Sequence, residues 1–206
     1  QFDPISSSLI DGSIFQSMMH VHERYLKEAR QSFDFNRHKV FYNMVDREGF
    51  EKYRLQDSDI KKYKQELGIH EEDFVIGKIA RSHVAKWSDL ILDMMPYLVK
   101  LVPNVKFIII GVPQSRLKRI KKSSYKDNII ILPETTDESV IHRFYQTIDV
   151  LAHSSKIGEC NGNTINEAMF WGKPVIVNST PTKDNGQLEQ VEHMITGIIA
   201  NTPQTY

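Results

Sequence analysis

The chain has 206 residues, and its 26 lysine and arginine residues balance 26 aspartate and glutamate residues. This neutrality provides no overall electrostatic field that would favour nucleic acid as a partner. The single cysteine, Cys160, excludes an internal disulfide and a zinc site built from cysteines. No apolar run approaches the roughly 20 residues of a membrane-spanning helix, and the length predicts one domain with a sizeable core.

The first third of the chain, up to residue 73, shows helical patterns and one short extended stretch. The expected elements are an amphipathic helix over residues 10–33, a short strand over 39–45 (KVFYNMV) and a capped helix over 57–68 (DSDIKKYKQELG). The chain starts without an initiator methionine or a signal peptide. We interpret residues 1–37 as a helical lead-in from an inter-domain region. Residues 38–206 are expected to form the main domain of a truncated protein.

From residue 74 onward, strand and helix patterns alternate. Short runs rich in β-branched residues predict strands over residues 74–80, 105–111, 128–133, 150–154, 174–179 and 196–200. Helices are predicted over residues 89–102, 116–125, 138–148, 163–172 and 187–194. Pro96 is expected to kink or break the first of these helices. The alternation predicts an α/β fold: a Rossmann-like parallel sheet of about six strands with helices on both faces.

Three loops at the carboxyl ends of these strands carry the residues for chemistry, because open parallel sheets bind ligands there. Arg81 and Lys86 follow the first of the six strands, residues 133–139 (PETTDES) follow the third, and residues 154–164 (SSKIGECNGNT) follow the fourth. The last loop enters a helix near Thr164, whose unpaired N–H groups and dipole favour phosphate. Gly162 allows a ligand to approach the backbone, and Arg81 and Lys86 could complete an anion clamp.

Glu159 and Glu167 lie eight positions apart, on either side of this helix start. Carboxylates repel phosphate, so next to an anion clamp they suit the hydroxyl groups of a sugar or a ribose. This combination describes a nucleotide-sugar site. The spacing from Thr164 to Glu167 also fits an ordinary capping box, and both roles are compatible if the cap opens when ligand binds.

The motif at residues 159–176, ECNGNTINEAMFWGKPVI, resembles the E-x7-E signature of the retaining GT-B glycosyltransferases of family 4. The pair Arg81 and Lys86 resembles the family's R-x4-K-G, with Trp87 in place of the glycine. Residues 43–50, NMVDREGF, resemble its N-G-V-D-x-x-x-F, with methionine for the glycine. The resemblance covers roughly residues 38–200 in one order. It implies the C-terminal, donor-binding half of a GT-B enzyme.

The resemblance also implies roles for individual residues. Three residues are expected to be catalytic: Arg81 and Lys86 bind the donor diphosphate and stabilise its departure, and Glu159 holds hydroxyls of the donor sugar. The expected nucleotide contacts are Pro133, Glu134, Gly162, Asn163, Thr164 and Glu167. Of these, the first two would contact the base, the residues at the helix start the diphosphate, and the last the ribose. The donor is a nucleotide diphosphate sugar, and neither a metal nor a cofactor is expected.

The family's acceptor half carries a glycine-rich loop that does not occur before residue 74. The chain alone is therefore expected to bind donor nucleotide weakly and to transfer little or no sugar. The acceptor, a glycan or a lipid, would meet the missing N-terminal domain. The expected location is cytoplasmic, with the inner face of a membrane left open as a docking place. The alternatives are a nucleotide-sugar epimerase of the GT-B type and a non-catalytic nucleotide-binding α/β module.

Several other features have ordinary structural interpretations. His153 follows a buried strand and is expected to be a core or rim histidine. Trp87 and Trp171 are expected to pack, and Cys160 to fill space in a loop. The basic run over residues 116–122 (RLKRIKK) is typical of a solvated helix face.

Overall fold

The computed structural model describes residues 13–21, 34–181 and 183–206. Its central sheet consists of β3 (Phe74–Ile79), β4 (Val105–Ile110), β5 (Ile129–Leu132), β6 (Val150–His153), β7 (Val175–Val177) and β8 (Gly197–Ile199). The strands lie in the order β5-β4-β3-β6-β7-β8, and every neighbouring pair is parallel. The six-stranded parallel α/β fold predicted from the sequence is confirmed.

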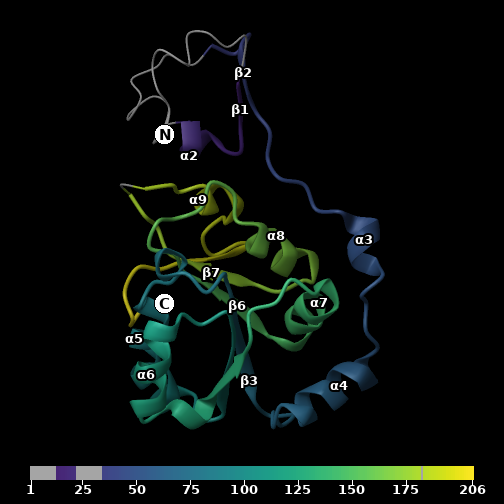
Figure 1. Ribbon diagram of the computed structural model, residues 1–206, viewed down its shortest axis with the longest axis vertical. Helices are drawn as coiled ribbons and strands as arrows, with labels where there is room; N and C mark the ends of the chain where they lie inside the picture. The colour runs from purple at the N-terminus through teal and green to yellow at the C-terminus, as the bar shows by residue number, and fades with distance from the viewer. Residues whose placement is uncertain (1–12, 22–33, 182) are drawn as a thin grey trace.

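Helices cover both faces of this sheet (Figure 1). They are α5 (Leu90–Leu101), α6 (Gln114–Lys122), α7 (Glu138–Thr147), α8 (Asn163–Phe170) and the short α9 (Gln187–Gln190), with 3-10 turns η2 (Val84–Lys86) and η3 (Lys126–Asn128). Side chains alternate between the faces of a strand, so Val75 packs with the core of α7 and α8, and Ile76 with that of α5 and α6. Burial of both faces explains why the strands are almost wholly apolar.

Helix α5 continues through Pro96, so the break expected there does not occur. A proline has no N–H group, and the carbonyl of Leu92, four residues earlier, therefore lacks its usual helical donor. The hydroxyl of Tyr125 donates to this carbonyl across a distance of 3.1 Å. A side chain from a distant part of the chain thus replaces the missing helical hydrogen bond.

The N-terminal segment departs from the prediction. Residues Ser13–Phe15 form strand β1, which pairs in parallel with β2 (His38–Val40), and α2 (Met18–His20) follows β1. The helix predicted over residues 10–33 is therefore wrong at β1, while residues 10–12 and 22–33 lie outside the described part of the chain. The pairing, extended by a hydrogen bond from the Phe41 N–H to the Phe15 carbonyl (2.8 Å), overrides the local helical pattern.

After β2, residues 41–66 run along the outside of the domain and form a strap that contains α3 (Arg47–Glu51) and α4 (Asp57–Glu66) (Figure 1). Gln146 of α7 holds this strap, because its side chain accepts from the Leu55 N–H (2.8 Å) and donates to the Tyr53 carbonyl (2.9 Å). The helix predicted over residues 57–68 is confirmed, but no side chain caps its N-terminus, where Gln56 is the N-cap. Gly68, at φ +69°, follows the end of α4, and its N–H donates to the Gln65 carbonyl (3.0 Å).

Candidate functional site

The sheet reverses its strand order between β3 and β6, and the loops that follow these two strands face each other there. Such a reversal leaves a crevice in which α/β domains bind ligands. A cavity of about 340 Å³ opens at this place. Six of the nine site residues predicted from the sequence line it: Arg81, Lys86, Glu159, Gly162, Asn163 and Thr164.

Helix α8 begins at the cavity with Gly162 as its N-cap and without a side-chain cap. Asn163 and Thr164 are its first two residues, so their backbone N–H groups have no partner within the helix. The Thr164 hydroxyl lies 3.2 Å from Nδ1 of His153, and the capping box considered for this helix is therefore wrong. The helix starts two residues before that box requires, which leaves its first N–H groups for a ligand.

Glu159 is the centre of a charged network at the cavity. Its carboxylate lies 2.6 Å from Nζ of Lys86 and 3.5 Å from Nε2 of His153. Burial raises the pKa of Glu159, but His153 and Lys86 more than offset burial, so this pKa lies below its ordinary value. Burial, Lys78 and Lys86 lower the pKa of His153, while Glu159 opposes them. Glu159 is thus held as a carboxylate beside a mostly neutral imidazole.

Arg81 and Lys86 leave β3 on one loop but differ in their surroundings. Arg81 is exposed at the cavity and, in the parts of the chain that the structure describes, has no carboxylate partner. Lys86 ends the turn η2, and the next residue, Trp87, is completely buried in the core beside α5. Trp87 therefore anchors the loop, as expected for a packing residue, and places Lys86 at the cavity wall.

The loop that carries Glu159 is held by the segment after β7. Gly158 has φ +68°, and a Cβ atom there would lie 1.5 Å from the Asp184 carbonyl oxygen. The Glu159 N–H donates to Gln187 (3.1 Å), and the Gly186 N–H donates to the Glu159 carbonyl (2.7 Å). Only glycine fits at position 158, because any side chain there would collide with the Asp184 backbone.

The other three predicted residues do not line this cavity. Glu167 lies farther along α8 and accepts a hydrogen bond from the buried Tyr145 hydroxyl (2.7 Å). Burial raises the pKa of Glu167, with Tyr145 opposing this shift. Pro133 and Glu134 are exposed after β5, which is two strands away from β3. The structure therefore brings the expected diphosphate and sugar contacts together, and leaves the ribose and base contacts apart.

Four polar cavity residues were missed as contacts: Gln16, Asn43, His153 and Asn161. Asn43 donates to the Asn163 side chain (2.6 Å), and Asn161 donates to the Gln16 carbonyl (3.4 Å). Asn43 is the first residue of the NMVDREGF motif, so the sequence contained a signal that could have marked it as a site residue. Gln16 carried no signal, because its position depends on the pairing of β1 with β2.

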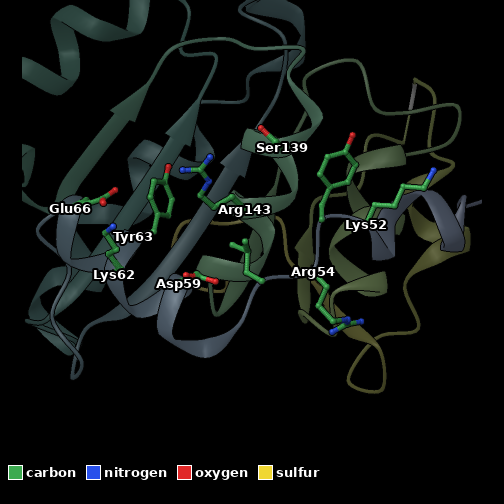
Figure 2. A pocket seen from close by; sticks show the side chains of 10 residues that line it. Lys52, Arg54, Asp59, Lys62, Tyr63, Glu66, Ser139 and Arg143 are labelled. Carbon is green, nitrogen blue, oxygen red and sulfur yellow. The ribbon is translucent and has the colours of Figure 1, made fainter.

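A second cavity, of about 350 Å³, lies between the strap and α7 and contains none of the predicted site residues (Figure 2). Arg143 lies over the ring of Tyr63, 4.9 Å from its centre. The lining mixes basic residues such as Lys52 and Lys62 with the acidic Asp59 and Glu66. This mixture selects no ligand class.

The described residues contain neither a metal-binding cluster nor a membrane-spanning helix. Within residues 13–21, 34–181 and 183–206, no group of three or more His, Cys, Asp or Glu side chains could hold a metal ion. Across the same part of the chain, no helix has the length and apolar character needed to cross a bilayer.

The sheet order, with an uncapped helix start at the reversal point, defines a Rossmann-like α/β domain whose ligand crevice lies at that point. Residues 59–205 match the family model described as glycosyl transferases group 1, and the chain belongs to this family. The resemblance found in the sequence is thus confirmed. No curated protein matches the chain.

Solved structures of glycosyltransferases share the fold. HepE from Anabaena, solved in complex with UDP and glucose, superposes with a TM-score of 0.76 at 25% identity, over 99% of this chain and 56% of HepE. A glycosyltransferase from Rickettsia africae ESF-5 gives a TM-score of 0.76 at 20% identity, over 95% and 51%. The pneumococcal O-GlcNAc transferase GtfA, in complex with UDP and GlcNAc, gives 0.67 at 18%, over 97% and 35%. The chain spans about half the length of the first two, and corresponds to the C-terminal half of a GT-B glycosyltransferase.

Proposed function

We propose that this chain is the donor-binding half of a retaining glycosyltransferase that uses a nucleotide diphosphate sugar. The observation that carries the proposal is the meeting of Arg81, Lys86 and the start of α8 around Glu159 in one cavity. HepE, a similar structure, was solved with UDP and glucose and with UDP-glucose. UDP is therefore the first donor nucleotide to test.

The diphosphate is proposed to lie between Arg81, Lys86 and the backbone N–H groups of Asn163 and Thr164. These groups are cationic or carry the positive end of a dipole, so they stabilise the charge that develops on the diphosphate as the sugar bond breaks. Fixed donors of this kind need no reorganisation during the reaction.

The carboxylate of Glu159 is proposed to accept hydrogen bonds from the sugar hydroxyls. Its ion pair with Lys86, 2.6 Å long, would link the sugar contact to the diphosphate contact. Glu167, oriented by Tyr145, is proposed to accept from the ribose hydroxyls. The assignment of Pro133 and Glu134 to the base rests on the family resemblance.

We also propose that residues 1–37 are a lead-in from a preceding acceptor-binding half, which would bring a glycan or a lipid to the donor. The 206-residue chain then binds donor weakly and transfers little or no sugar. Product analysis with UDP-glucose and a panel of acceptors checks this, and transfer at a rate typical of glycosyltransferases would contradict it.

The binding proposal is tested by calorimetric titration of UDP and uridine into the chain and its variants. Arg81→Ala should weaken UDP about 10- to 100-fold, because a charge-assisted contact to the diphosphate is lost, and should leave uridine unchanged. Glu167→Ala should weaken both ligands, because both contain the ribose.

Arg47→Ala removes an exposed arginine outside the cavity and serves as the matched control, with no change expected. Unchanged UDP affinity in both cavity and ribose variants would refute the donor site. Tighter binding of GDP or ADP than of UDP would support the donor site but would show that the preferred base is guanine or adenine.

A further inference from the structure

Lys78, the fifth residue of the central strand β3, is a lysine with no exposed surface. Its Nζ donates to the carbonyl of Ser154 (2.8 Å) and lies 4.8 Å from the centre of the Trp87 ring. Among the residues that the structure describes, no carboxylate lies within ion-pair distance of Lys78; Glu159 acts on it from farther away. A buried ammonium without a paired carboxylate costs free energy of folding, so this arrangement needs a reason.

The surroundings of Lys78 contain further buried polar groups. Trp87 Nε1 is buried and has no hydrogen-bond partner among the described residues. His153 Nε2 is buried as well, with a carboxylate oxygen of Glu159 3.5 Å away. His153 and Glu159 line the cavity, and both interact electrostatically with Lys78. Lys78 therefore lies in a polar layer directly behind the wall of the candidate donor site.

The protonation of Lys78 is sensitive to charge nearby. The pKa of Lys78 is lowered to about 7: burial is the main cause, Lys86 also lowers it, and Glu159 opposes both. The neighbouring His153 also has a lowered pKa, and Glu159 remains a carboxylate. An anion bound in front of this layer favours the charged form of Lys78.

We propose that Lys78 is a positioning residue for the donor diphosphate: it takes up a proton as the diphosphate binds, and its ammonium holds the Ser154 end of the loop that carries Glu159. The ammonium then supports Arg81 and Lys86 with a further positive charge from behind the wall. Trp87, where the family motif has glycine, supplies the aromatic face that shelters this ammonium. The inference rests on the proposed function.

The test is calorimetric titration of UDP into the chain at about pH 8, in two buffers with different ionisation enthalpies. At this pH the terminal phosphate of UDP is fully ionised and free Lys78 is mostly neutral, so any proton taken up enters the protein. We expect an uptake of about half a proton per UDP. In Lys78→Met this uptake should disappear, and UDP affinity should fall about tenfold while uridine affinity stays unchanged.

Lys86→Met serves as the comparison: it should lose UDP affinity and keep a reduced proton uptake, because Lys78 is still present but has lost a neighbouring charge that lowers its pKa. Uptake that persists in Lys78→Met would place the proton on His153 and overturn the inference. The wild-type titration needs no variant: UDP binding without proton uptake refutes the role of Lys78 even if Lys78→Met does not fold. If wild-type protein does not bind UDP at all, the proposed function fails first, and the inference falls with it.

Discussion

At the scale of single residues, the two glutamates of the E-x7-E motif differ because their neighbours differ. Burial raises the pKa of both carboxyl groups. At Glu159 the adjacent His153 and Lys86 outweigh burial, whereas at Glu167 the hydrogen bond from Tyr145 does not. Glu159 therefore remains a carboxylate to lower pH than Glu167. This separation suits two hydroxyl contacts with different tasks and follows from charge and burial around each residue.

Lys78 gives a residue-scale prediction about stability. Its pKa is about 7 in the fold, below the roughly 10.4 of an unfolded lysine, so between these pH values the unfolded chain binds more protons. Stability should therefore rise with pH across this window, and the cost of the buried charge is complete below about pH 7. Lys78→Met should be more stable than wild type by about 2 to 4 kcal/mol near pH 6, and the difference should shrink towards pH 10.

Urea denaturation at several pH values measures this difference. Lys106→Met, on the neighbouring strand and partly exposed, is the matched control and should follow the wild-type pH profile. A Lys78→Met variant less stable than wild type at every pH would contradict the prediction. The expected gain in stability on removing Lys78 agrees with a residue kept for binding.

At the scale of elements, turns and helices here depend on partners from elsewhere in the chain. Helix α5 tolerates Pro96 because Tyr125 supplies the donor that the proline lacks. The loop before α8 keeps its course because Gly158 lets the backbone pass close to Asp184. In both cases the irregular backbone depends on a contact with a residue far away in the sequence, and local propensity does not predict such a contact.

The Pro96 arrangement predicts a coupling between two residues. Tyr125→Phe should destabilise the wild type by about 1 to 2 kcal/mol, because it leaves the buried Leu92 carbonyl without a donor. In a Pro96→Ala background the new backbone N–H can bond to this carbonyl, so Tyr125→Phe should cost less. A double-mutant cycle in urea measures the coupling; additive effects would show that the tyrosine does not replace the helical bond.

The glycines give a matched pair for the loop before α8. Gly158 and Gly172 have φ of +68° and +69°, but an added Cβ meets the Asp184 backbone only at Gly158 and nothing within 4 Å at Gly172. Gly172→Ala should cost about 1 kcal/mol from backbone strain alone. Gly158→Ala should cost over ~3 kcal/mol and weaken UDP binding, because the loop that carries Glu159 must move. Denaturation and UDP titration of both variants check this, and equal effects would contradict it.

At the scale of the whole molecule, the N-terminal segment closes one side of the cavity. Glu189 of α9 accepts hydrogen bonds from the N–H groups of Met18 (3.1 Å) and Met19 and from the Tyr42 hydroxyl (2.7 Å). It thereby joins the β1–β2 sheet to the main domain (Figure 1). This contact explains how Gln16 and Asn43 reach a cavity built by residues far away in the sequence.

Removal of Glu189 should release this segment. In Glu189→Ala, hydrogen exchange at the amides of Met18 and Met19 should become about 10- to 100-fold faster, because three hydrogen bonds to one carboxylate are lost. Glu192→Ala, an exposed glutamate three positions away, is the control and should exchange like wild type. Unchanged exchange in Glu189→Ala would show that other contacts hold the segment.

The sequence by itself determined the features that depend on short-range patterns. Alternating apolar runs predicted β3 to β8 and the helices between them, and the six residues that meet in the cavity come from the loop after β3, the loop after β6 and the start of α8. These features follow from hydrophobic periodicity and from the rule that parallel strands place their carboxyl ends together.

Only the tertiary structure decided the features that arise between distant segments. The pairing of β1 with β2 replaced a predicted helix, and Tyr125 allowed α5 to continue through Pro96. Pro133, Glu134 and Glu167 lie outside the cavity, and Lys78 lies behind it. The physical reason is the same throughout: hydrogen bonds and burial depend on which parts of the chain meet in space, and a local pattern does not encode the partner.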